Sequence, residues 1–282
     1  GNKFRQRKNL RLALPDNFNQ IIEPFCGSAG FSRTLVHESY LNPTQVWLND
    51  TYAPLTSFYK VISKGQINEL IASVYDIKAN CGLGNRELYE THLERFHLRI
   101  PDMEKALSFF IVNRLCGGSF MLGDLFYSEP FGNGRRGLRD KAIENLRQAG
   151  MMMEGCKVTH GDYQEVKLQS SSSFMLIDPP YPLGVKKEKR FYDAPFAYQR
   201  FATWCHRIKD TGNILITFDD NERHLSNFKG WNIYTHDVFF RGRKVRGWGK
   251  EMLIANYEIP NALEHGFEKV ELSNRTTVSL AA

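Results

Sequence analysis

The chain of 282 residues has few cysteines and no long apolar run, and each shortage argues against a class of protein. Its five cysteines are scattered and form no C-x-x-C pair, which argues against a disulfide framework and a zinc site. No apolar run reaches the length that crosses a membrane, and no signal peptide opens the sequence. We therefore expect a protein of a reducing compartment that works without a metal and without a membrane.

Patterns typical of several catalytic chemistries are also missing. His160, His206, His224 and His236 show no spacing that would suit a nucleophile or a metal, so we assign them structural roles. No Pro-Cys loop for covalent attack by a cysteine is present, and no carboxylate cluster typical of a nuclease stands out. The sequence shows no internal repeat.

Composition leaves room for one large domain, or for a domain with a substantial insert. Hydrophobic residues make up 42% of the chain, which is enough to bury a sizeable core. Lys and Arg number 37 against 31 Asp and Glu, giving a formal net charge of +6. A basic balance favours a polyanionic partner, although a modest excess is also common on ordinary soluble proteins.

The most informative stretch is an apolar run, residues 174–177 (FMLI), that leads directly into residues 178–181 (DPPY). The run predicts a short strand buried on both faces. It must end at Asp178, because the prolines that follow cannot donate to a sheet. The carboxyl ends of parallel strands are where ligands bind, so Asp178 and Tyr181 are expected at the mouth of a site.

These four residues fit a planar heterocycle that carries an exocyclic amino group. The ring would stack on Tyr181, while the amino protons would go to the ionised Asp178 and to a proline carbonyl. Two aligned acceptors would free the nitrogen lone pair for attack. A strand followed by a proline turn, whose Asp caps a loop, fits the same four residues equally well.

A second pattern lies in the N-terminal half. Residues 20–25 predict a strand, and residues 27–30 (GSAG) predict a turn into a helix. Glycines let a backbone approach a ligand closely at a helix N-terminus, although a glycine pair alone more often marks a simple turn. The next predicted strand, residues 45–49, ends at Asp50, which is placed to accept ribose hydroxyls.

Together the two patterns resemble a known family of enzymes. Residues 21–32 (IIEPFCGSAGFS) resemble the cofactor loop of amino-methyltransferases that use S-adenosylmethionine, and residues 178–181 resemble their catalytic motif. Their order, with a long insert between them, resembles the α-group of adenine-N6 DNA methyltransferases, the Dam-like enzymes. The likeness extends from Lys3 to about Tyr257. It departs from the usual F-x-G-x-G at Ala29, which we interpret as a shifted turn.

The resemblance implies an α/β fold, with a doubly wound, mostly parallel seven-stranded sheet of the Rossmann-like methyltransferase type. We expect residues 1–64 and 156–260 to form a discontinuous catalytic domain and residues 65–155 a helical target-recognition insert. Residues 261–282 would be a C-terminal tail.

The sheet would close with an antiparallel hairpin. We expect its two strands at residues 231–238 and 252–257, on either side of a basic loop at residues 241–250.

The resemblance also implies a cofactor site and a catalytic site. Lys3 matches the end of a Gly-Gly-Lys-type motif that contacts the methionine end of S-adenosylmethionine, and Asp162 and Tyr163 match an acid-aromatic pair that contacts its adenine. On the residues alone, Gly-Asp-Tyr is an ordinary turn. The implied cofactor-binding residues are Lys3, Glu23, Phe25, Gly27, Gly30, Asp50, Asp162, Tyr163 and Asp178. The implied catalytic residues are Asp178, Pro179, Pro180 and Tyr181.

The implied reaction is methyl transfer to the exocyclic N6 of an adenine that is flipped out of double-stranded DNA. Basic loops suit DNA phosphates, although any single arginine also fits a solvated loop. Gly117, Gly118 and Leu122 stand where readers of GATC carry tyrosine, asparagine and arginine, so that specificity is not carried over. The candidate DNA-binding residues are Asn113, Arg114, Arg135, Arg136, Arg139, Lys186, Lys187, Lys189 and Arg190.

Other functions stay open at this point. Cytosine-N4 methylation is the nearest alternative, although those enzymes usually carry Ser before Pro-Pro-Tyr, and glutamine methylation usually goes with Asn there. An inactive DNA-binding regulator is an alternative of another class. The presence of Asp50, Asp178 and Tyr181 speaks against it, because binding alone does not require the full acceptor set. We expect a monomer or weak dimer in the cytoplasm of a prokaryotic or phage-infected cell.

Overall fold

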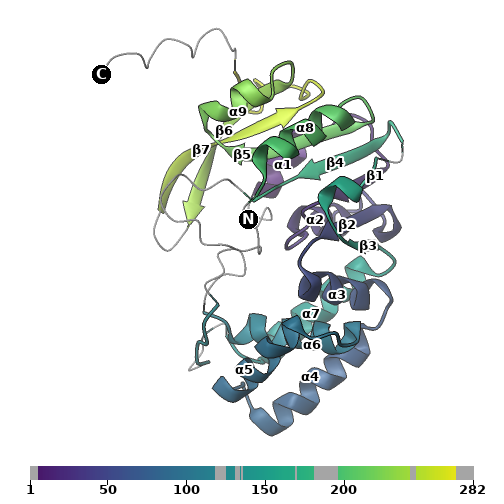
Figure 1. Ribbon diagram of the computed structural model, residues 1–282, viewed down its shortest axis with the longest axis vertical. Coiled ribbons are helices and arrows are strands. Elements are labelled where there is room, and N and C mark those ends of the chain that lie inside the picture. Colours follow the sequence, from purple (N-terminus) through teal and green to yellow (C-terminus); the bar gives the residue numbers. More distant parts are fainter. Residues whose placement is uncertain are drawn as a thin grey trace.

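The computed structural model describes residues 6–117, 125–130, 134, 136–168, 170–180, 196–241 and 246–270. Within these ranges a single eight-stranded sheet has the strand order β3-β2-β1-β4-β5-β7-β6-β8 (Figure 1). Its first five positions are parallel and the closing hairpin is antiparallel, which confirms the predicted fold class. The eighth strand, β8 (Glu268–Lys269), adds two residues beside β6 at the edge.

Of the five parallel strands, four form because short, mainly apolar runs are buried on both faces of the sheet, whereas the edge strand at residues 157–160 is exposed or half-buried. Their bounds are β1 Gln20–Glu23, β2 Val46–Asp50, β3 Lys157–His160, β4 Ser173–Ile177 and β5 Asn213–Asp219. Successive side chains point to opposite faces, so Ile21 and Leu176 enter one core while Ile22 and Ile177 enter the other. The register aligns the carboxyl ends of all five strands along one edge.

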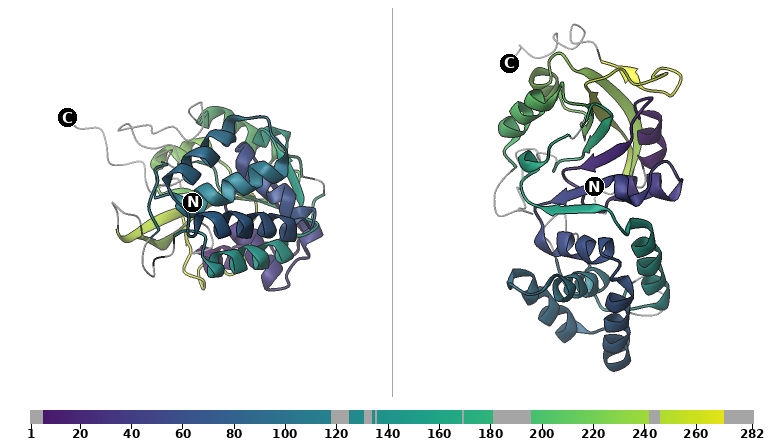
Figure 2. Two further views of the ribbon diagram at one scale, coloured as in Figure 1. Left: turned by 90° about the horizontal axis from the view of Figure 1, so that it is seen from below. Right: turned by 90° about the vertical axis from the view of Figure 1, so that its right-hand side faces the viewer.

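Helices cover both faces of the sheet. The first core contains residues of α1 (Arg7–Leu12), α2 (Gly30–His37) and α3 (Ala53–Ser63). The second core is formed with α8 (Tyr198–Ile208) and α9 (Glu222–Asn227). This two-sided covering is the doubly wound arrangement, and Figure 2 shows it from the side.

A group of helices below the sheet forms the insert (Figures 1 and 2). Its members are α4 Ile67–Cys81, α5 Arg86–Glu94, α6 Asp102–Leu115 and α7 Asp140–Met153. Helix α3 packs along α6, and α7 packs against α2, α3 and α4. One core cluster therefore continues from Val46 in the sheet to Leu70 and Ile111 in the insert. The helices on either side of residue 65, α3 and α4, share this core. The boundary between catalytic domain and insert at residue 65 therefore stays a prediction.

The closing hairpin is longer than the sequence indicates. Strands β6 (Asn232–Arg241) and β7 (Arg246–Ala255) pair in continuous register from Asn232↔Ala255 to Arg241↔Arg246. The predicted basic loop at residues 241–250 is therefore wrong for residue 241 and for residues 246–250, which belong to the two strands, while residues 242–245 lie outside the described ranges. Residues 246–250 lack an apolar alternation, but cross-strand backbone hydrogen bonds suffice to hold them in a two-stranded ribbon.

The described residues give information on disulfides, membrane-spanning helices and metal sites. All five cysteines carry free thiols, and four of them are buried. No helix in the described ranges is long and apolar enough to cross a membrane. The same ranges contain no group of three His, Cys, Asp or Glu side chains placed to hold a metal ion.

Candidate active site

The carboxyl edge of the parallel strands brings the candidate site residues together. Along the strand order β3-β2-β1-β4 this edge carries Asp162, Asp50, the turn at Gly27 and Asp178. They come from positions far apart in the chain, and they meet because neighbouring parallel strands end on the same side of the sheet.

Asp50 holds the turn that follows β1. Its Oδ2 accepts the N–H of Gly27 at 3.1 Å, and its Oδ1 accepts the N–H of Tyr52 at 3.0 Å. The residue is only 4% exposed, and burial raises the pKa of its carboxyl while the backbone N–H groups oppose the shift. Each carboxylate oxygen keeps a further lone pair, so Asp50 can still accept hydroxyl groups of a ligand.

The turn itself is open on the side of Gly27. Gly27 has a φ of +46°, and a Cβ added there would meet nothing within 4 Å. The other left-handed residue of this turn is Ala29, also at +46°, and Gly30 is the first residue of α2. A left-handed conformation costs an alanine about 1–2 kcal/mol. The turn is therefore held in a strained form by its surroundings, among them the Tyr59 hydroxyl, which donates to the Gly27 carbonyl at 3.2 Å.

Glu23 fastens α2 to the end of β1. Its Oε1 accepts the backbone N–H of Ser32 at 3.0 Å and also the Ser32 hydroxyl. The side chain is buried, and burial raises the pKa of Glu23 to about 7, with the nearby charge of Asp178 adding to the rise. This contact with the helix is not evident in the sequence, and contact with a cofactor remains a prediction for Glu23.

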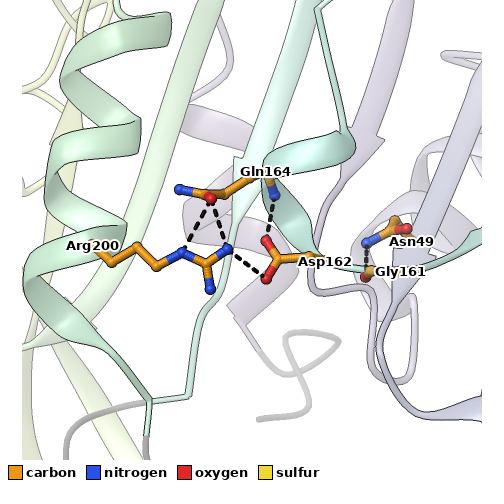
Figure 3. A network of polar contacts seen from close by, with 5 residues as sticks. All are labelled: Asn49, Gly161, Asp162, Gln164 and Arg200. Atoms are coloured by element: carbon orange, nitrogen blue, oxygen red, sulfur yellow. Dashed lines mark hydrogen bonds and ion pairs between the residues drawn. The ribbon is translucent and has the colours of Figure 1, made fainter.

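A polar network orients Asp162 (Figure 3). Its Oδ1 accepts the N–H of Gln164 at 2.9 Å, and its Oδ2 lies 3.1 Å from a terminal nitrogen of Arg200. Arg200 also donates from Nε and from the same terminal nitrogen to Oε1 of Gln164, at 3.1 and 2.7 Å. Helix α8 thus supplies a cation that positions the β3 loop, a role that the sequence does not reveal.

Phe25 and Tyr163, both predicted to touch the cofactor, stack on each other. Their ring centroids lie 5.0 Å apart at an interplanar angle of 30°. Phe196 and Phe201 contact both rings. The Tyr163 hydroxyl is buried with no hydrogen-bond partner in the described part of the chain, and burial raises the pKa of Tyr163 to about 12. The pair forms an aromatic wall beside Asp162.

Asn49 joins three strand ends and was missed by the sequence analysis. Its Nδ2 donates to the carbonyls of Pro24 and Gly161, both at 3.0 Å, and Figure 3 shows the contact with Gly161. Its Oδ1 accepts the Thr159 hydroxyl at 2.8 Å. The sequence could have indicated this role, because Asn49 is an amide within a predicted strand that is buried here, and a buried amide needs hydrogen-bond partners.

Asp178 follows β4 at the same edge. The pairing Ile177↔Ile216 sets it beside Thr217 of β5, whose hydroxyl donates to the Asp178 Oδ1 at 3.0 Å. Asp178 is half-buried, Pro179 is buried and Pro180 is half-buried. Thr217 is a further residue that the sequence did not single out. Tyr181 and Lys3 lie outside the described residues.

Three of the candidate DNA-binding arginines gather at the end of α6. Arg114 Nε donates to the Gly137 carbonyl at 3.4 Å, and Arg139 Nε donates to the Arg136 carbonyl at 2.8 Å. The N–H of Gly137 also donates to the Arg114 carbonyl at 2.9 Å, so the backbone joins Arg114 to the segment that carries Arg136 and Arg139. Burial lowers the pKa of Arg114, and the charges of Arg136 and Arg139 lower it further. Asn113 is exposed beside them. The positions Arg135, Lys186, Lys187, Lys189 and Arg190 lie outside the described ranges.

The fold and the edge are those of a Rossmann-like methyltransferase. The family model of the D12 class N6 adenine-specific DNA methyltransferases matches residues 1–230, and the chain belongs to that family. The predicted Dam-like adenine-N6 methyltransferase is thereby confirmed, and the family implies that S-adenosylmethionine is the methyl donor.

Solved structures and curated proteins add little to this. Two structures of the rRNA methyltransferase aviRa from Streptomyces viridochromogenes, at 1.5 and 2.4 Å, resemble the chain at 13% identity. The first covers 93% of this chain and 84% of that chain with a TM-score of 0.39. The second covers 91% and 84% with a TM-score of 0.38. No curated protein matches the chain.

Proposed function

We propose that the carboxyl edge binds S-adenosylmethionine across β3, β2 and β1 and holds a flipped adenine beside it at Asp178. One observation carries this proposal: acceptors at the ends of adjacent strands lie in succession around a backbone turn that is open at Gly27. Site-specific methylation of adenine N6 in duplex DNA is the function that this arrangement supports best.

The residues at the edge suit the chemistry of this cofactor. Asp50 has spare acceptor capacity for ribose hydroxyls, and Asp162 is oriented to accept an exocyclic amino group of adenine. The aromatic wall of Phe25 and Tyr163 offers apolar surface to the adenine ring. When bound, the cofactor supplies an electrophilic methyl group, and the acidic edge suits the positive charge of its sulfonium.

The target base would be held by the end of β4. The Thr217 hydroxyl holds one oxygen of the Asp178 carboxylate in place. The remaining lone pairs of the carboxylate can then accept a hydrogen bond from the adenine amino group. The carbonyl of Pro179 is the second acceptor in this proposal, and Tyr181 is the stacking ring. Two acceptors on the amino group would turn the nitrogen lone pair away from the ring and toward the methyl donor.

Double-stranded DNA is the proposed substrate, with base flipping as the route to the edge. The cluster of Arg114, Arg136 and Arg139 is proposed to contact phosphates. We expect the protein to act as a monomer or weak dimer, which sedimentation with and without DNA would test.

The proposal is tested by methylation-sensitive sequencing of DNA from cells that express the protein, together with mass spectrometry of the released nucleosides. We expect N6-methyladenine at one short sequence. N4-methylcytosine as the product, or unmodified DNA from cells with soluble protein, would overturn the proposal.

A further inference from the structure

The closing hairpin extends beyond the edge that carries Asp178. Strand β5 pairs with β7 from Leu215↔Ala255 to Asp219↔Glu251, where β5 ends. Residues 246–250 of β7 then continue in register with residues 237–241 of β6. Because β7 runs antiparallel to β5, this extension lies past the carboxyl edge of the parallel strands. We call residues 237–241 and 246–250 the hairpin arm, and Figure 1 shows β6 and β7 projecting from the sheet.

The arm exposes an aromatic pair. Phe239 and Trp248 are direct cross-strand partners, with ring centroids 5.4 Å apart at an angle of 76°. Trp248 is 76% exposed and Phe239 is 37% exposed. The tryptophan is flanked by Gly247 and Gly249, so neither neighbour along the strand carries a side chain that could cover its ring.

The exposed pair continues a sheet face that is covered elsewhere. Alternation along β7 puts Trp248 on the same face as Met252 and Ile254, which are buried in the core under α8 and α9. A cross-strand aromatic pair stabilises a ribbon, but stabilisation alone does not require so large a ring in water. An exposed aromatic surface of this kind is typical of an interaction site.

The basic residues in and next to the arm indicate a negatively charged partner. Between Asp237 and Glu251 the sequence contains basic residues and no acid. The basic residues in this stretch are Arg241, Arg243, Lys244, Arg246 and Lys250. Lys250 is paired with Glu268, and Arg243 and Lys244 lie outside the described residues, so the basic character of this stretch is known from its sequence. Cations close in sequence to an exposed aromatic ring are a combination with which proteins bind nucleic acid, because the cations contact phosphates and the ring contacts bases or sugars.

We propose that the hairpin arm is a second DNA-contacting surface, in which Trp248 packs against the DNA next to the flipped adenine. The inference rests on the proposed function, since DNA that delivers a base to Asp178 lies over the edge past which the arm projects. The arm is separate in the chain from the insert and from the loop after β4, so it contributes contacts that neither of them provides.

Trp248 itself is the probe for this proposal. The other three tryptophans, Trp47, Trp204 and Trp231, are buried, so acrylamide quenching of tryptophan emission reports chiefly on Trp248. We expect quenching to fall severalfold when the protein is saturated with target duplex in the presence of S-adenosylhomocysteine. A Trp248→Phe variant should lose the part of the tryptophan emission that acrylamide quenches, which verifies that this emission comes from Trp248.

Affinity provides the second readout. Trp248→Ala should weaken duplex binding by about tenfold, as for the removal of one stacking interaction, and should leave cofactor affinity unchanged. Leu263→Ala is the matched control, because Leu263 is 80% exposed but follows β7 at the opposite edge of the sheet.

The outcomes separate the two proposals. A wild-type protein that binds and methylates duplex DNA while Trp248 stays as quenchable as before would overturn the arm proposal alone. A wild-type protein that neither binds nor methylates duplex DNA would overturn the proposed function, and the arm proposal with it.

Discussion

At the scale of single residues, Asp50 combines a structural role with a proposed binding role. Its two oxygens hold the N–H groups of Gly27 and Tyr52, so the carboxylate shapes the turn in which the cofactor would lie. A carboxylate that is already fixed by the backbone loses little freedom when a ligand binds, which favours affinity.

The first prediction concerns this residue. Asp50→Ala should raise the dissociation constant of S-adenosylmethionine tenfold or more, because a charge-assisted hydrogen bond worth about 1.5–3 kcal/mol is removed. Asp50→Asn keeps one acceptor oxygen and should have a smaller effect. Titration calorimetry measures both variants, and unchanged affinity in a folded Asp50→Ala protein would remove Asp50 from the site.

The second prediction concerns the pH dependence of stability through Glu23. Its pKa in the folded protein is raised to about 7, mainly by burial, above the ordinary value of 4.5. The folded state therefore holds a proton that the unfolded state releases, so stability is lost as pH rises from about 4.5 to about 7. The loss should be of the order of 3 kcal/mol.

Glu23→Gln keeps an acceptor for Ser32 but does not titrate, so it is the control. The difference in unfolding free energy between wild type and variant, from urea denaturation at several pH values, isolates the contribution of Glu23. A difference that stays constant across this range would show that Glu23 is not buried in the way described.

At the scale of elements, the sequence predicted the parallel strands well and the contacts between their ends poorly. Runs such as residues 174–177 are short, apolar and bounded by serine and proline, so local chemistry marks the strand and its end. Thr217 and Asp178 are 39 residues apart and Asn49 and Thr159 are 110 apart, so only the sheet register reveals those pairs. The hairpin arm escaped prediction because it pairs without burying an apolar face.

The third prediction belongs to this scale. Asn49→Ala removes the side chain that joins the ends of β1, β2 and β3 and leaves buried polar groups without partners. We expect a loss of about 3 kcal/mol in stability and a weaker affinity for S-adenosylmethionine. Asn80→Ala, at an exposed amide on α4, should change neither. Equal melting temperatures for the two variants would contradict the role given to Asn49.

At the scale of the whole molecule, the sheet edge, the arginine cluster and the hairpin arm are three parts of one proposed DNA-binding protein. The net charge of +6 is modest, so placement of the cations matters more than their number. The arginine cluster belongs to the insert and the arm belongs to the sheet, so both regions would contribute to DNA binding.

The fourth prediction tests this placement. Changing Arg114, Arg136 and Arg139 to alanine should flatten the plot of log affinity against log salt by about one unit for each DNA phosphate that the protein no longer neutralises. The control removes the same charge elsewhere, at Lys209, Lys229 and Lys269, and should leave the slope nearly unchanged. Identical slopes in the two triple variants would place the cluster away from the DNA.

The central claim is that Asp178 draws on the amino protons of the target adenine. Asp178→Asn keeps an acceptor oxygen and should retain part of the activity, whereas Asp178→Ala should lose nearly all of it. Both variants should still bind duplex DNA, and thermal melting controls for folding.

Single-turnover methyl transfer to duplex DNA by the Asp178→Ala variant, with product read as N6-methyladenine, is the most direct test. The predicted result is a folded, DNA-binding protein whose transfer rate is nearly abolished. A folded Asp178→Ala protein that transfers methyl groups at the wild-type rate would contradict the account.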